Sequence, residues 1–159
     1  MAKEPSFDAR EAHKFFSAQC FNAAWDQIDN TERSEKQNEQ MLLASFASLW
    51  HWTQRPECDQ SNYSLGYWQL SRVYSLLGEA ENARKYAELC LSASQGEGML
   101  PFYTAYAYEA LARAEATAGN GKAVEKYLAE ANRVMEKMTD ADARNQLLAD
   151  LSTIVMKES

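Results

Sequence analysis

The sequence predicts an all-α fold, built as a solenoid of about three antiparallel helical hairpins and closed by a C-terminal capping helix. Three observations support this prediction. Apolar residues recur at helical spacing along nearly the whole chain, and alternating strand patterns are absent. Only 6 Gly and 3 Pro interrupt a composition rich in helix-forming residues. A unit of helix, glycine turn and helix also occurs twice in the chain, as described below.

The first predicted hairpin covers the N-terminal third of the chain. Its first helix spans about 8–29, and its second spans about 34–54. Ser34 and Gln37 form a capping-box pattern at the start of the second helix. Pro56 ends that helix, because the residue before a proline is pushed out of helical geometry.

The second predicted hairpin consists of helices over about 60–77 and 79–94. Gly78 lies between them, in the position that glycine often takes directly after a helix. The segment 95–98 contains two further glycines, which predicts a loop before the next helix.

The third predicted hairpin consists of helices over about 101–118 and 122–137. Pro101 suits the first turn of a helix, and the segment 119–121 is a turn with two glycines. Thr139 and Asp140 are N-cap candidates for a last helix, whose apolar stripe runs from position 147 to 155. The connections are short, so neighbouring helices should be antiparallel, and residues 1–159 should form a single domain.

Composition and charge narrow the classes of partner and the compartment. The chain has 16 basic and 23 acidic residues, a formal net charge of −7, and no basic run that would displace counterions from phosphates. We therefore expect neither a nucleic acid nor a membrane as partner. The N-terminal residues lack the apolar stretch of a signal peptide, which makes the cytoplasm the default expectation. Cys20, Cys58 and Cys90 follow no metal or redox motif and should be small core residues.

The internal repeat is the most informative feature of the sequence. The segment 67–74, followed by Gly78, recurs as 108–115, followed by Gly119, at an offset of 41 residues. Each copy has an aromatic residue, then Leu three positions later, a small residue, Arg, and Gly six positions after the Arg. A repeat of this length, built of two helices and a glycine turn, is typical of solenoids, in which stacking buries the apolar face of each unit.

The repeat resembles the tetratricopeptide-repeat (TPR) signature. The matching residues are Tyr67, Leu70, Ser71, Tyr74, Gly78, Ala83 and Cys90. Ala87, Glu115 and Asn132 depart from the family pattern, and the offset exceeds the usual spacing. The resemblance covers about 64–134, and the first hairpin matches poorly. The chain is also similar to a group of small, uncharacterised bacterial TPR-like proteins, which implies a fold and no activity.

The resemblance implies a concave groove that receives a peptide and is lined by the first helix of each hairpin. The residues that it places toward such a groove are Trp68, Gln69, Arg72, Glu109 and Arg113. Arg72 and Arg113 occupy equivalent positions, so their guanidinium groups would clamp the carboxylate of an acidic segment or a free C-terminus. Alternatively, each Arg pairs with a carboxylate of a neighbouring helix and only ties the repeats together.

Aromatic and titratable residues outside that set have a structural interpretation. Trp25 and Trp50 lie on core-type stripes, whereas Trp52 and Trp68 are better candidates for an exposed interface. His13 and His51 have no metal-ligand spacing around them. Glu115 is a candidate for a buried carboxylate with a raised pKa, but its position near the end of a helix favours partial exposure. We identify no catalytic residues, metal ligands or cofactor motif, and therefore expect no enzyme.

These observations favour a protein- or peptide-binding adaptor that uses the groove between stacked hairpins. The alternative is a structural subunit that self-associates as a homodimer through an exposed apolar patch, because open ends of a solenoid require capping. A small-molecule pocket or an enzyme is a minor alternative.

Overall fold

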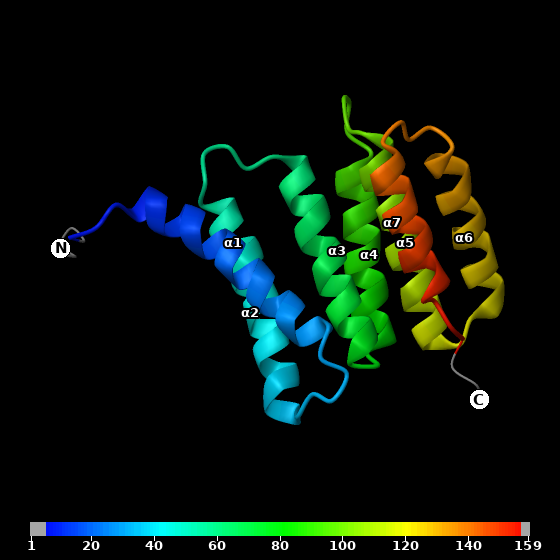
Figure 1. Cartoon of the computed structure of the whole chain (residues 1–159), viewed down its shortest axis with the longest axis horizontal. Coiled ribbons are helices and arrows are strands. Elements are labelled where there is room, and N and C mark those ends of the chain that lie inside the picture. Colours follow the sequence, from blue (N-terminus) through cyan, green and yellow to red (C-terminus); the bar gives the residue numbers. More distant parts are fainter. Residues whose placement is uncertain (1–5, 157–159) are drawn as a thin grey trace.

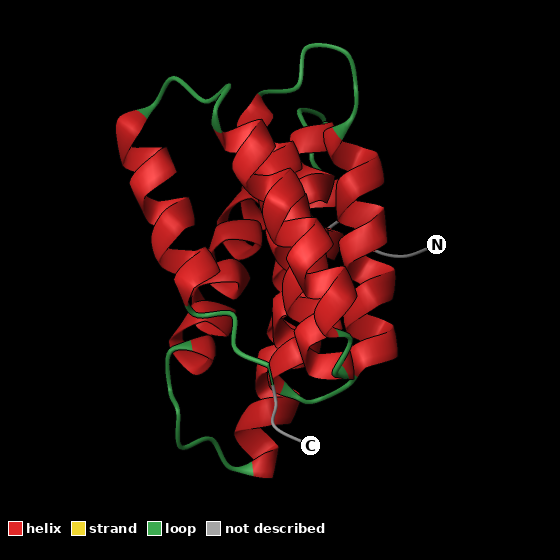
Figure 2. Cartoon of the chain, turned by 90° about the vertical axis from the view of Figure 1, so that its right-hand side faces the viewer, coloured by secondary structure: helices red, strands yellow, loops and turns green. Residues whose placement is uncertain are grey.

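The computed structural model describes residues 6–156, which form seven α-helices and no strand (Figures 1 and 2). In chain order the helices are α1 (Ala9–Ile28), α2 (Glu35–Thr53), α3 (Gln60–Leu76), α4 (Ala80–Ser94), α5 (Pro101–Ala118), α6 (Gly121–Met135) and α7 (Ala141–Ser152). The all-α prediction is therefore confirmed. None of these described helices is long and apolar enough to cross a membrane.

Five of the seven described helices (α1, α2, α3, α6 and α7) begin where a polar side chain accepts from their first backbone N–H groups. The predicted capping box is present: the Ser34 hydroxyl accepts from the Gln37 N–H, and the Gln37 side chain accepts from the Ser34 N–H. Asp140 caps α7, as one of the two predicted candidates. The last helix was predicted to carry an apolar stripe as far as position 155, but α7 ends at Ser152, so the stripe continues beyond the helix.

Helices that are adjacent in sequence pack side by side as the pairs α1–α2, α3–α4 and α5–α6. Successive pairs are joined by contacts of α2 with α3 and of α4 with α5. Helix α3 also packs on α5, and α7 lies against α5. Helices α1, α3 and α5, the first members of the three pairs, therefore lie with α7 on one side of the molecule.

The two copies of the sequence repeat share three packing features. The ring centroids of Tyr67 and Tyr86 are 6.1 Å apart, and those of the equivalent Tyr108 and Tyr127 are 6.2 Å apart. The turn glycines Gly78 and Gly119 have φ angles of 77° and 76°, in the left-handed region that favours glycine. The leucines and small residues of the repeat, at positions 70, 71, 111 and 112, are buried in both pairs.

Small residues allow close packing between the helices. Ala83, Ala87 and Cys90 line the buried face of α4. Gly66 of α3 lies against Leu49 of α2: a Cβ atom at position 66 would be 2.5 Å from Leu49 Cδ1. The absence of a side chain at Gly66 therefore sets how closely the first helix pair approaches the second.

Candidate functional site

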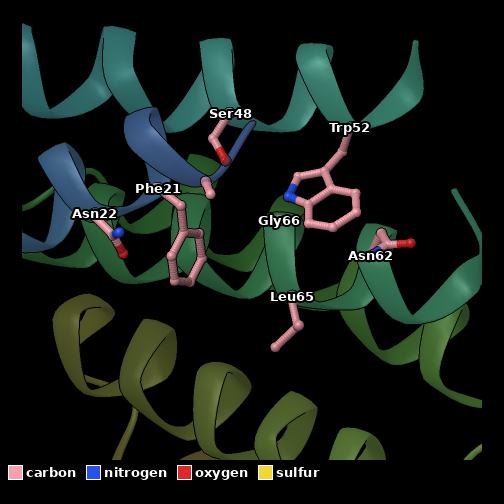
Figure 3. Close-up of a pocket in the computed structure, with 8 residues that line it drawn as sticks. Phe21, Asn22, Ser48, Trp52, Asn62, Leu65 and Gly66 are labelled. Carbon is pink, nitrogen blue, oxygen red and sulfur yellow. The ribbon is translucent and has the colours of Figure 1, made fainter. Parts of the chain in front are cut away.

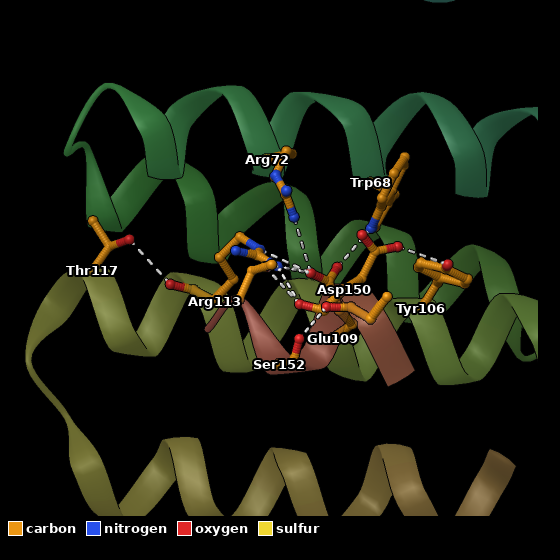
Figure 4. A network of polar contacts seen from close by, with 10 residues as sticks. Trp68, Arg72, Tyr106, Glu109, Arg113, Thr117, Asp150 and Ser152 are labelled. Carbon is orange, nitrogen blue, oxygen red and sulfur yellow. Dashed lines mark hydrogen bonds and ion pairs between the residues drawn. The ribbon is translucent and has the colours of Figure 1, made fainter. Parts of the chain in front are cut away.

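A buried carboxylate, Glu109, lies at the centre of the side formed by α3, α5 and α7 (Figure 4). The Trp68 indole Nε1 donates to Glu109 Oε2 at 2.7 Å. Arg72 Nη1 donates to Oε1 at 3.3 Å, and Arg113 Nε donates to the same oxygen at 2.8 Å. One carboxylate thus joins two residues of α3 to Arg113 of its own helix.

Helix α7 is tied to this network through Asp150. The Tyr106 hydroxyl donates to Asp150 Oδ2 at 2.8 Å, and Arg113 Nη2 donates to the Asp150 carbonyl oxygen at 3.0 Å. Arg113 Nη2 also donates to the Thr153 hydroxyl at 2.8 Å. Burial, followed by the hydrogen bond to Asp150, raises the pKa of Tyr106, which therefore stays protonated as a donor.

The structure brings four of the five predicted groove residues together. Trp68, Arg72, Glu109 and Arg113 share one network, in which both arginines point toward the same carboxylate. Gln69 lies apart from it, fully buried against α1, and its Nε2 donates to the Phe21 carbonyl oxygen at 3.1 Å. The ion pair of Arg72 with Glu109 is a pair between helices, of the kind that the alternative interpretation of the arginines predicts.

The arginine pair retains limited capacity for a further anion. The Arg72 Nε atom is buried and has no hydrogen-bond partner within residues 6–156. Burial, followed by repulsion from Arg113, lowers the pKa of Arg72, while Glu109 and Asp150 oppose this shift. Because two carboxylates already face the two guanidinium groups, the network is close to neutral.

An aromatic pocket opens beside this network and is formed by α1, α3, α5 and α7. Its volume is about 230 Å³. It is lined by Phe21, Trp25, Leu65, Trp68, Phe102, Tyr106 and Gln146. The rings of Trp25 and Trp68 have centroids 5.5 Å apart, and the Tyr106 ring packs edge-on against Trp68 at 5.4 Å. This continuous aromatic wall suits an apolar side chain better than a charged one.

A second pocket, here called the Trp52 pocket, lies between α1, α2 and α3 (Figure 3). Its volume is about 160 Å³ and its lining is mainly apolar. The lining residues are Ala18, Phe21, Asn22, Ser48, Trp52, Asn62, Leu65 and Gly66. Phe21 and Leu65 also line the aromatic pocket, so the two pockets are neighbours.

The position of Trp52 is fixed by Arg55. The Arg55 guanidinium carbon lies 3.7 Å from the centroid of the Trp52 ring. The same guanidinium donates to the Ser17 hydroxyl at 3.0 Å and to Glu57 Oε1 at 3.0 Å. Hydrogen bonding to Arg55 lowers the pKa of Glu57, so this carboxylate stays ionised as the partner of Arg55. These contacts hold one wall of the Trp52 pocket in place.

The structure corrects the predicted roles of two tryptophans. Trp50 was expected in the core, but its side chain is 55% exposed, and Trp68 was expected at an exposed interface, but it is buried. Trp68 is buried because α3 has helix pairs on both sides, so that more than one stripe of this helix is covered. Trp50 belongs to the first helix pair, which has a neighbouring pair on one side only.

Glu115 is buried, contrary to the partial exposure favoured above, and its pKa is lowered and not raised. Arg84 Nε donates to Glu115 Oε1 at 2.6 Å, and Arg84 Nη2 and Asn120 Nδ2 donate to Oε2 at 3.1 Å. The hydrogen bond from Arg84 is the largest cause of a lowered pKa and outweighs the effect of burial. Sequence reasoning missed this pair because Arg84 precedes Glu115 by 31 residues.

The cysteines offer no reactive thiolate at the buried position. Burial raises the pKa of the Cys90 thiol to about 12. Cys90 is fully buried, as predicted for a core residue, whereas Cys20 and Cys58 are partly exposed.

No protein-family model, curated protein or solved structure matches this chain. The interpretation of the two pockets therefore depends on their geometry alone.

Proposed function

We propose that this chain is a TPR-like adaptor that binds a segment of a partner protein across α1, α3 and α5. The segment would place one large apolar side chain in the aromatic pocket and a neighbouring one in the Trp52 pocket. The observation that carries this proposal is the pair of adjoining apolar pockets that share Phe21 and Leu65. Apolar pockets with few polar groups are the usual form of such anchoring sites.

The equivalent ring contacts of Tyr67 with Tyr86 and of Tyr108 with Tyr127 support the TPR-like assignment, because equivalent packing in successive helix pairs is what a helical repeat requires. The pairing of Arg72 and Arg113 with Glu109 favours an apolar anchor over a carboxylate as the main determinant of binding. Arg72 Nε has no hydrogen-bond partner within residues 6–156, so in this proposal an acidic residue or the free C-terminus of the same segment makes a secondary contact with Arg72.

Selection from a random peptide library tests the proposal. The expected peptides carry two neighbouring large apolar residues, and their affinity should fall by about tenfold or more in the variant Ala18→Arg, which inserts a long charged side chain into the Trp52 pocket. The matched control is Ala129→Arg on α6, an exposed alanine far from both pockets in the chain. Selection of the same peptides by wild type and Ala18→Arg would refute the proposal.

A second variant separates the apolar anchors from the arginine pair. Arg72→Gln removes the guanidinium but leaves both pockets lined as before. Peptides held mainly by a carboxylate would lose their affinity in Arg72→Gln, and that affinity would fall steeply with added salt. Peptides held by apolar anchors should bind Arg72→Gln nearly as well as wild type.

A further inference from the structure

A cluster of five aromatic rings lies on the first helix pair, away from both pockets. We call it the end-face cluster; its members are His13, Phe15, Phe16, Trp50 and His51. The rings form a continuous chain of contacts at centroid distances of 4.9–5.5 Å. Phe15 packs against Phe16, Phe16 against His51, and Trp50 against both histidines. The cluster therefore spans α1 and α2.

The two histidines of the cluster are bonded to each other. Their Nδ1 atoms are 2.8 Å apart, so that one ring donates and the other accepts. Burial, followed by the proximity of His13, lowers the pKa of His51, which is therefore uncharged at neutral pH. The pair is built from residues 38 positions apart, and no sequence motif marks it.

The cluster exposes large apolar surface. The exposed fractions are 60% for Phe15, 44% for Phe16 and 55% for Trp50. Because an aromatic side chain offers 150–250 Å² for burial, these three rings leave about 300 Å² of aromatic surface uncovered. Scattered exposed apolar residues are normal, whereas a contiguous apolar patch of about 300 Å² is of the size that the largest patch of a protein has, and such patches are often functional.

The cluster continues into an uncharged seam on each helix. Residues at spacings of three and four form these seams, on positions that face away from the contact of Leu49 with α3. The seam of α1 comprises Ala9, Ala12, Phe16, Gln19 and Ala23, and that of α2 comprises Gln40, Leu43, Ala47 and Trp50. All nine are exposed or partly exposed, and none is charged, although 25% of the chain is charged.

The size of this face matches one side of a dimer interface. A standard interface buries about 800 Å² per partner, and somewhat more than half of that area is apolar. The aromatic rings supply about 300 Å² of this, and the alanines and Leu43 of the seams supply the remaining apolar part. The two uncharged seams meet those of a second copy without like-charge repulsion, whereas the net charge of −7 on the whole chain disfavours contact elsewhere.

We propose that the end-face cluster and its two seams form an isologous homodimer interface, in which the first helix pairs of two copies pack against each other. This interface would cover the open end of the helix stack and leave the aromatic pocket and the Trp52 pocket accessible. It is independent of the proposed peptide binding, because the face lies opposite the contact of the first helix pair with α3.

Sedimentation equilibrium over a wide range of protein concentrations tests this interface. Ala23→Glu places a charged side chain in the uncharged face, where the dimer would bury it without a partner, and should raise the dissociation constant by about tenfold or more. The exposed Ala129 of α6 gives a matched control, since Ala129→Glu adds the same charge and helix-forming residue outside the face. Trp50→Ser removes an exposed ring and should weaken the dimer in the same direction.

Wild type and Ala129→Glu are expected to dimerise with the same dissociation constant. Circular dichroism should give the same helix content for all four proteins, because every substituted side chain is exposed. A wild-type protein that sediments as a monomer at all concentrations would overturn the proposal. Equal weakening of the dimer by Ala23→Glu and Ala129→Glu would overturn it as well.

Discussion

Replacing Glu109 by Gln perturbs a fully buried charge that three side chains share. Glu109 is fully buried and accepts from Trp68 at 2.7 Å, from Arg72 at 3.3 Å and from Arg113 at 2.8 Å. Glutamine has nearly the same shape but carries no charge. Its amide group would also turn an N–H toward donors on Trp68 or the arginines, where an acceptor is required.

The cost follows from the two guanidinium groups that the substitution leaves without their shared counter-charge. Removing one partner of a buried ion pair costs about 3–5 kcal/mol, because the remaining charge stays buried and uncompensated. That loss is a large part of the roughly 5–15 kcal/mol by which a domain is stable. For a domain of this size it corresponds to a fall in Tm of about 6–20 °C.

Urea unfolding followed by circular dichroism measures this loss, with Glu130→Gln as the matched control. Glu130 pairs with Arg133 on the surface of α6, where both side chains are at least 33% exposed. Its substitution should change the free energy of unfolding by less than about 0.5 kcal/mol. If Glu109→Gln and Glu130→Gln unfold at the same urea concentration, the buried network does not hold α3, α5 and α7 together.

Three further predictions concern other parts of the molecule. Arg84 holds the pKa of Glu115 below its ordinary value of 4.5. The ionised carboxylate therefore stabilises the fold above pH 4.5, and this contribution to the free energy of unfolding is lost as the pH falls through the lower pKa of the folded state. Urea midpoints measured from pH 7 downward should therefore fall less steeply in acid for Glu115→Gln than for wild type, and parallel curves would contradict the pairing. Gly119→Ala should cost about 1–2 kcal/mol, because position 119 has a φ of 76°, whereas Gly96→Ala, which meets only Met99 at 3.5 Å, should cost less. A thiol reagent should modify Cys20 and Cys58 in the native protein and Cys90 only on unfolding, because Cys90 is buried and its pKa is raised to about 12. Fast modification of Cys90 in the native protein would contradict this and show that its site opens.

The helices were largely predictable because their ends carry local signals. The capping box at Ser34, Pro101 in a first turn and the glycines at positions 78 and 119 each act within a few residues, so sequence spacing captures them. The end of α7 was predicted less well, because apolar residues continue beyond Ser152 although the helix does not. An apolar stripe indicates which residues seek burial, and it does not fix where a helix ends.

The sites were less predictable because they depend on contacts between distant residues. The repeat placed Arg72 and Arg113 on one side correctly, yet nothing local to Glu109 indicated that it would be their shared partner. The rule that a helix buries one stripe failed for Trp68, because α3 is covered on more than one side. The two pockets were missed altogether, since Phe21, Trp52 and Leu65 come from three different helices.

The four tryptophans provide the most direct test of peptide binding across α1, α3 and α5. Trp25 and Trp68 line the aromatic pocket, Trp52 lines the neighbouring pocket, and Trp50 lies on the end face. In a titration with a selected peptide, followed through the four indole N–H signals by NMR at constant protein concentration, we expect the signals of Trp25 and Trp52 to shift and that of Trp50 to stay. Shifts confined to Trp50 would place the peptide on the end face and contradict binding in the two pockets.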